Sequence, residues 1–192
     1  MEFLKSLNWV DILIAALLIR TLYIGYKMGF VIEFMKTVGA LTAVFFAFHY
    51  YTKLAVFMVH ATGGKGGVTD ALFQAIAFTL IWAFTVIIIK FVRDGIFLVF
   101  MVQTISMFDR WGAVAVAVVR FSLTASMLLF VFLLMDQPYM ERMTVSSFSQ
   151  QNVLFLAPDT YRKITNGFVA KLFPNQKVNT AVTEELYEAG KK

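Results

Sequence analysis

Four charged side chains stand inside apolar segments of the sequence, where each could bind an ion, relay a proton or pair with an opposite charge. They are Asp11, Arg20, Glu33 and Arg120. Ionisable residues within membrane segments are rare and usually face a partner or a water-filled path, so all four are candidate functional residues. Asp11 also has a structural interpretation. It follows Asn8 at the start of a predicted helix, where an Asn cap and a carboxylate both stabilise the positive end.

Arg20 and Glu33 flank the segment Gly25–Gly29 and lie about one helical turn from it. The two glycines, with Lys27 between them, predict a tight bend that joins two helices. If these helices close into a hairpin, the two side chains lie at a similar depth, and we predict that they form an ion pair. The alternative is that Arg20 extends to the membrane interface alone.

Arg120 follows the dipeptide Asp109-Arg110 by ten residues, which is roughly 15 Å of helix. If Arg110 marks the membrane interface, Arg120 lies near the middle of a hydrocarbon core about 30 Å thick. If the helix enters the membrane later, Arg120 extends to the interface instead. All three residues are candidate site residues in either case.

No residue pattern indicates catalysis, metal binding or a cofactor. The chain has no cysteine, and its two histidines, His49 and His60, have no carboxylate nearby in the sequence. The segment Thr62–Gly67 is rich in glycine, but Lys65 is followed by Gly66 rather than by Ser or Thr, as a phosphate-binding P-loop would require. We therefore expect no catalytic residue, no metal site and no cofactor.

The composition indicates a membrane protein. Of 192 residues, 59% are hydrophobic and 15% are charged, against roughly 45–50% and 25% in soluble domains. The mean hydropathy is +0.73, and a soluble fold of this size has too little interior to bury so much apolar surface. The net charge is +5, but the basic residues lie between apolar runs. This arrangement is typical of membrane topology and argues against nucleic-acid binding.

We predict an all-α, polytopic membrane protein. Its membrane domain, residues 1–135, would contain four transmembrane helices and a short interfacial helix, at about 8–24, 30–51, 70–92, 111–135 and 96–105 respectively. The first span is the weakest because it carries Asp11 and Arg20, so a three-span fold in which it only dips into the membrane is the alternative.

The distribution of basic residues predicts the orientation. The first and third connections are flanked by three basic residues each: Arg20, Lys27 and Lys36, and then Lys90, Arg93 and Arg110. The second connection has only Lys53 and Lys65. We therefore expect the first and third connections in the cytoplasm and both termini on the outer, periplasmic side.

Residues 136–192 are predicted to form an extramembrane tail with one amphipathic helix at about 159–173, capped by Asp159 or Thr160. Its apolar stripe would consist of Tyr161, Ile164, Phe168, Leu172 and Phe173. Such a stripe can lie on the outer leaflet, dock on a partner helix or pack on the protein's own loops.

The ordered combination of these features resembles the colicin V production family of bacterial inner-membrane proteins. The resemblance covers about residues 8–135 and rests on Trp9-Val10-Asp11, the hairpin bend with Gly25, Lys27, Gly29 and Phe30, then Glu33, His49-Tyr50-Tyr51, Asp109-Arg110 and Arg120. Ala113 and Ala117 stand where the family has glycines, so close helix packing stays possible. Met28 replaces the Arg that usually precedes Gly-Phe.

The resemblance implies a multi-pass inner-membrane protein that supports peptide-toxin production or export, envelope homeostasis or biofilm formation, without catalysis. The expected partners are membrane lipid and other membrane or envelope proteins, with a homo-oligomer left open and nucleic acid excluded. The alternative is a small transporter or channel subunit that uses the intramembrane charges. A third hypothesis, an intramembrane enzyme, has no supporting motif.

Overall fold

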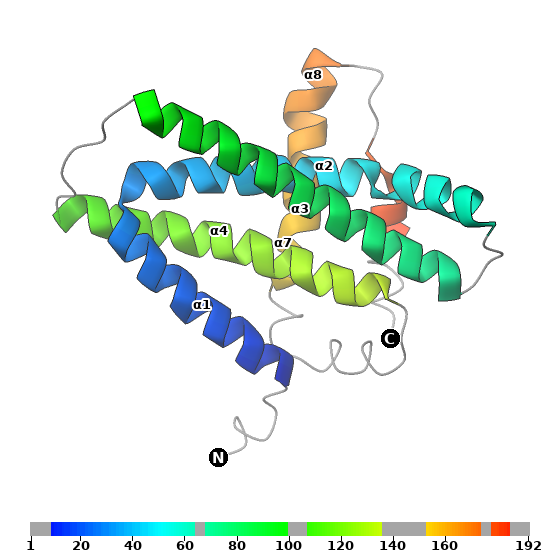
Figure 1. Cartoon of the computed structure of the whole chain (residues 1–192), viewed down its shortest axis with the longest axis horizontal. Helices are drawn as coiled ribbons and strands as arrows, with labels where there is room; N and C mark the ends of the chain where they lie inside the picture. Colours follow the sequence, from blue (N-terminus) through cyan, green and yellow to red (C-terminus); the bar gives the residue numbers. More distant parts are fainter. Residues whose placement is uncertain (1–8, 64–67, 100–106, 136–152, 174–177, 185–192) are drawn as a thin grey trace.

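The computed structural model of the chain describes residues 9–63, 68–99, 107–135, 153–173 and 178–184, and all regular structure in these ranges is helical (Figure 1). The four long helices are α1 (Trp9–Met28), α2 (Phe30–Thr62), α3 (Val68–Val99) and α4 (Met107–Leu134). The tail contains α7 (Leu156–Ile164), a π-helical turn (Thr165–Val169) and α8 (Ala170–Leu172), which follow one another without a break. The predicted all-α fold is confirmed.

Three helices in the described part of the chain are long and apolar enough to cross a membrane. They are α2, the segment Asp70–Phe97 of α3, and α4. The first helix, α1, has 20 residues and carries Asp11, Arg20 and Lys27. Its full crossing of the membrane stays a prediction.

Two helices, α2 and α3, extend beyond the ends that the sequence predicted. α2 passes the predicted end at residue 51 and reaches Thr62, where Gly63 terminates it in the left-handed conformation with φ 67°. Its 33 residues span about 50 Å, which is more than an upright helix needs to cross a hydrocarbon core of about 30 Å.

The predicted separate helix at residues 96–105 needs correction at its start. Residues 96–99 form the last turn of α3, and residues 100–106 lie outside the described part of the chain. The helix continues because no proline interrupts it after residue 92, and the one glycine there, Gly95, costs only about 1 kcal/mol in a helix.

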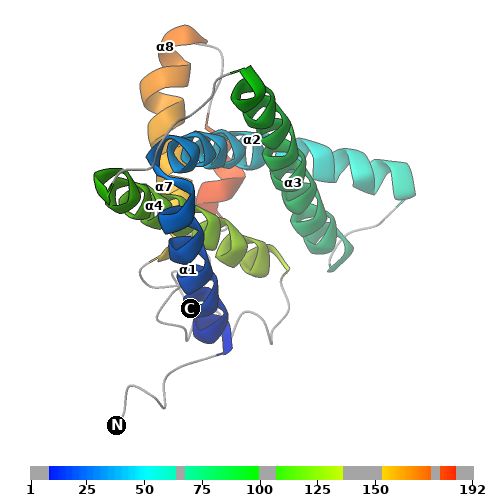
Figure 2. The same cartoon turned by 60° about the vertical axis from the view of Figure 1, so that its left-hand side comes forward.

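α2 is the central helix of the bundle. It packs against α3 on one side and against α4 on another, whereas α1 packs mainly on α4 (Figures 1 and 2). The bend at Gly29 is present, with φ 84°, but α1 and α2 diverge from it. The predicted closed hairpin is therefore wrong, because α4 occupies the place beside α2 that α1 was expected to take.

Small residues permit the close approach of α1 and α4. A Cβ atom added to Gly25 would lie 2.8 Å from the Cβ atom of Ala117 and 3.5 Å from the carbonyl oxygen of Ala113. Helices in membranes associate through such tight contacts, because lipid provides no hydrophobic force between them. Ala113 and Ala117 thus form the packing surface of α4 for Gly25.

Aromatic side chains join α2, α3 and α4. The ring of Phe48 lies 5.0 Å from that of Phe78 and 4.8 Å from that of Phe130, measured between centroids. All three side chains are fully buried. By contrast, α3 exposes large apolar residues along its outer face, including Phe84 and Phe91, as a helix in contact with lipid does.

Gly25→Ala should lower the melting temperature of the protein in detergent, because overpacking a tight contact costs about 1–3 kcal/mol. The nearest atom, Ala117 Cβ, is attached directly to the backbone of α4, so it cannot move aside by a change of rotamer. Gly95→Ala is the matched control: nothing lies within 4 Å of its added Cβ atom, and alanine favours the helix. Equal melting temperatures for the two variants would contradict the packing of α1 on α4.

Candidate functional site

A buried carboxylate with two cations forms the centre of the site. Glu33, in the first turn of α2, has no exposed surface. Its Oε1 atom accepts a hydrogen bond from Lys36 Nζ at 2.6 Å, and its Oε2 atom accepts one from Arg120 Nε at 3.0 Å. A buried charge is stable only when opposite charges and hydrogen bonds compensate for lost water, and the two cations do so here.

Glu33 lies where three helices meet. Lys36 follows it by one turn on α2, Arg120 comes from α4, and a Cβ atom on Gly25 of α1 would be 3.7 Å from Glu33 Cγ. The side chains of Lys36 and Arg120 are 17% and 20% exposed, so the cations lie between the buried carboxylate and the surface. The Lys36 ammonium also contacts Met28 Sδ at 3.0 Å.

The predicted Arg20–Glu33 pair is wrong. Arg20 is exposed, and the partner of Glu33 from another helix is Arg120. The reason is the direction of α1, which leaves α2 at the bend and packs on α4. Arg120 therefore pairs with a carboxylate and does not reach the interface alone, and no local sequence signal links residues 87 positions apart.

Asp109 caps α2 from another helix. Its Oδ1 atom accepts a hydrogen bond from the backbone N–H of Phe30 at 3.1 Å. The residue before Phe30 is Gly29, which has no side chain to supply this acceptor. The negative charge also faces the positive end of α2. The sequence marked Asp109 as a candidate without indicating this capping role.

The neighbouring residues of the bend make aromatic contacts. The guanidinium of Arg110 lies 5.4 Å from the ring centre of Tyr26, and Trp111 meets the same ring edge-to-face. Lys27 lies over the ring of Tyr23 at 4.5 Å. These cation–π contacts keep basic side chains at the end of the bundle where α1 ends and α4 begins.

Asp11 lies apart from this group. It is buried in the first turn of α1, where a carboxylate is stabilised by the positive end of the helix. Asn8, its expected capping partner, lies outside the described residues. Of the predicted site residues, the structure therefore brings Glu33 and Arg120 together, joins Asp109 and Arg110 to the bend, and leaves Asp11 and Arg20 separate.

A second polar cluster fastens the tail to the bundle. Tyr161 of α7 is fully buried, and its hydroxyl oxygen lies 3.1 Å from His49 Nδ1 of α2. The same oxygen accepts the backbone N–H of Asn179 at 2.9 Å, and the Asn179 side chain donates to the carbonyl of Phe48 at 2.9 Å. Burial raises the pKa of the Tyr161 phenol, so it stays protonated at neutral pH. We call this cluster the tail lock.

α4 also holds the tail. Ser126, which is fully buried, donates to the carbonyl of Leu154 at 2.6 Å and accepts the backbone N–H of Ala157 at 2.9 Å. α7 begins at Leu156, so the predicted caps Asp159 and Thr160 lie inside the helix. Both cap predictions are wrong.

The predicted apolar stripe of the tail divides into a buried part and an exposed part. Tyr161 is buried, whereas Phe168, Leu172 and Phe173 are 67%, 58% and 63% exposed. The π-helical turn at Thr165–Val169 separates the two parts. A π-helical turn, with its i→i+5 hydrogen bonds, holds more residues per turn than the α-helix on which the stripe was drawn, so residues beyond it face another direction.

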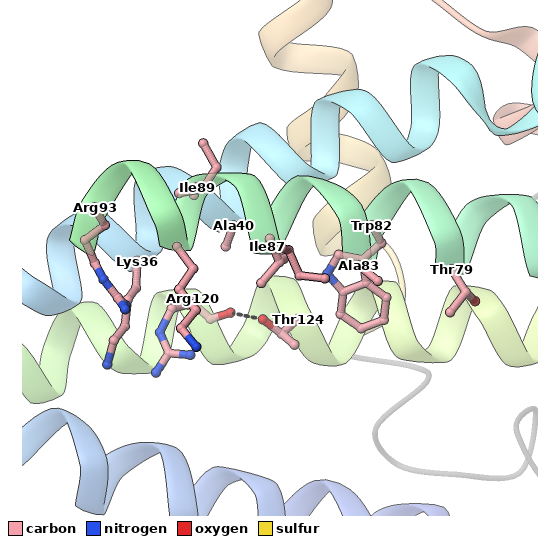
Figure 3. A pocket seen from close by; sticks show the side chains of 13 residues that line it. Lys36, Ala40, Thr79, Trp82, Ala83, Ile87, Ile89, Arg93, Arg120 and Thr124 are labelled. Carbon is pink, nitrogen blue, oxygen red and sulfur yellow. Dashed lines mark hydrogen bonds between the residues drawn. The ribbon is translucent and has the colours of Figure 1, made fainter. Parts of the chain in front are cut away.

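A cavity of about 570 Å³ lies beside the Glu33 cluster, between α2, α3 and α4 (Figure 3). Lys36 and Arg120 line it together with Lys90 and Arg93 of α3. Among the described residues no group of three or more His, Cys, Asp or Glu side chains could hold a metal ion. The charged side chains that line this cavity are thus all basic.

Glu33→Gln or Arg120→Gln alone should destabilise the protein by about 1–3 kcal/mol, because the first leaves two cations without their shared carboxylate and the second leaves one oxygen of the fully buried Glu33 without its donor. The double variant should lose less than the sum of both. Arg20→Gln is the control and should leave the melting temperature unchanged. Additive losses, or a loss from Arg20→Gln equal to that from Arg120→Gln, would show that the pair is absent.

Tyr161→Phe should loosen the tail without moving the four long helices. Removing the hydroxyl leaves the buried groups of His49 and Asn179 without this partner, at about 1–3 kcal/mol. Limited trypsin digestion of the full chain should then cut faster at Arg162 and Lys163, which are exposed. Tyr23→Phe, at an exposed ring, is the control, and unchanged digestion of the Tyr161 variant would argue against the tail lock.

Comparison with protein-family models finds one match, described as colicin V production protein, over residues 10–157. The match covers more than half of the chain and includes Glu33, Asp109 and Arg120, which connect α2 to α4. No curated protein and no solved structure matches the chain. The chain belongs to the colicin V production protein family.

Proposed function

We propose that the protein is a non-enzymatic factor of the bacterial inner membrane, which supports peptide-toxin production or export, or envelope homeostasis, by binding other proteins. The observation that carries this proposal is the exposed apolar end of the tail helix, formed by Phe168, Leu172 and Phe173. We call these three residues the tail patch. Family membership and the three helices of spanning length support the membrane location.

The tail patch is presented by a fixed helix. The tail lock and Ser126 hold the start of the tail against α2 and α4. α8 then projects beyond the bundle in both views of the fold (Figures 1 and 2). Burying each bulky apolar side chain is worth roughly 1.5–3 kcal/mol, so the patch offers a partner helix substantial binding energy.

The basic residues support an orientation with both termini on the periplasmic side. Lys27, Arg93 and Arg110 belong to the ends of α1, α3 and α4 that lie together at one end of the bundle (Figure 1). Positive charge favours the cytoplasmic side of a membrane. The tail patch would then face envelope proteins outside that membrane.

A second candidate function is a small transporter or channel subunit. The observation that favours it is the cavity beside the Glu33–Arg120 pair, since charged residues along a cavity within membrane helices mark solute paths. Movement of a solute by the purified protein in vesicles would favour this function over the first.

The triple variant Phe168→Ser, Leu172→Ser, Phe173→Ser tests the first proposal in a strain that lacks the gene. We expect normal abundance in the membrane, because the three side chains are exposed, and loss of toxin production or envelope integrity. The triple variant is a more specific test than truncation after Asn152, because truncation would also remove the buried residues Leu154 and Tyr161.

Phe57→Ser is the matched control, because Phe57 on α2 is 68% exposed and stands outside the tail. It should complement the missing gene. Full complementation by the triple variant would contradict partner binding through the tail patch. If Glu33→Gln and Arg120→Gln together then abolished function at normal abundance, the transport hypothesis would take its place.

A further inference from the structure

The cavity between α2, α3 and α4 has one basic end and one apolar end. Lys36, Arg93 and Arg120 lie at one end, and Trp82 and Ala83 lie toward the other (Figure 3). Lys90, about one helical turn before Arg93 on α3, also lines the cavity. Gly39 and Ala40 of α2 also line it, and Gly39 is packed closely against Ile89 of α3, where an added Cβ atom would lie 2.6 Å from Cγ2. The cavity is thus divided by polarity along its length.

The basic end keeps positive charge after its internal ion pairs are counted. Glu33 balances one of the two charges of Lys36 and Arg120, and Asp94 balances Arg93 at 2.6 Å. Lys90 has no ion pair within the described part of the chain. Two of the four positive charges therefore remain for an anion from outside.

The hydrogen-bond donors at this end are also incompletely used. Arg120 donates to Glu33 only through Nε, and within the described residues its two Nη groups make no hydrogen bond. A guanidinium presents five N–H donors in a planar fork that matches phosphate oxygens. Arg120 can therefore hold Glu33 and an anionic head group at once.

The apolar end continues along α3 for a length suited to a fatty chain. From Arg93 to Thr79 the lining extends over 14 residues, which is about 21 Å of helix. Between them lie Trp82, Val86 and Ile87. Thr79 and Thr124 donate their hydroxyls to carbonyls of their own helices, so they present no free donor to the cavity.

We propose that this cavity binds an anionic phospholipid, with the phosphate at Lys90 and Arg120 and one acyl chain along Trp82 and Val86. The charge selects an anion, and the apolar half selects an amphiphile over inorganic phosphate, which would leave that half empty. A helix from a second copy would bury the remaining positive charges without compensation, which is costly.

Quenching of Trp82 fluorescence tests the site in the full-length protein. The variant Trp9→Phe, Trp111→Phe leaves Trp82 as the single tryptophan, since the chain has three. We would reconstitute it in phosphatidylcholine vesicles that contain a small fraction of phosphatidylglycerol with brominated acyl chains. We expect stronger quenching than from an equal fraction of brominated phosphatidylcholine, and saturation as the anionic lipid is increased.

Lys90→Gln should weaken the preference for the anionic lipid about fivefold, as expected for one basic residue near a membrane surface. Lys90 lies outside the Glu33 pairs, so the fold is kept. Lys27→Gln is the matched control: it removes the same charge at the same end of the bundle but outside the cavity, and it should leave the preference unchanged.

Three results would overturn the proposal. Equal quenching by the two brominated lipids would show ordinary lipid contact without a site. Displacement of the quenching lipid by inorganic phosphate would show an anion site that does not need the acyl chain. Absence of quenching by either lipid, together with crosslinking of two copies through α3, would show that a second copy covers the cavity.

Discussion

Burial of the Glu33 carboxylate is the constraint on which the arrangement of α1, α2 and α4 depends. An ionised carboxylate without exposed surface needs cations within hydrogen-bond distance. Lys36 of α2 bonds only Oε1, so α4 must approach closely enough for Arg120 to bond Oε2. α1 packs on α4 beside the same carboxylate, where Gly25 permits close contact with Ala117.

Two contacts fix α4 along α2. Asp109 caps the start of α2 through the Phe30 N–H, and Arg120, three turns further along α4, pairs with Glu33. A helix held at two points of its length can neither slide nor rotate freely. The same pairing keeps Arg120 at the basic end of the cavity, while the tail lock at His49 positions the tail patch. Arg120 and His49, which hold the helices and the tail in place, therefore also position the two proposed binding surfaces, the cavity and the tail patch.

Composition and hydrophobic runs were sufficient to predict an all-α membrane protein and most helix positions, because burial in lipid requires long apolar helices. Charged residues within the apolar runs and the family resemblance also marked Glu33, Asp109 and Arg120 as candidate site residues. The partner of Glu33 was predicted wrongly, since proximity in sequence favoured Arg20 and only the packing of α4 brings Arg120 near. The split of the tail stripe was missed for a similar reason: periodicity assumes a regular α-helix, and the π-helical turn breaks it.

The central claim is that α4, through Arg120, compensates the buried Glu33 charge. Solid-state NMR in lipid tests it directly, by dipolar transfer between ¹⁵Nε of arginine and ¹³Cδ of glutamate in the labelled full-length protein. The structure predicts a cross-peak from Arg120 to an ionised Glu33, at a distance that follows from Nε–Oε2 contact at 3.0 Å, and none from Arg20. A cross-peak from Arg20, or a protonated Glu33 without an arginine contact, would contradict the account.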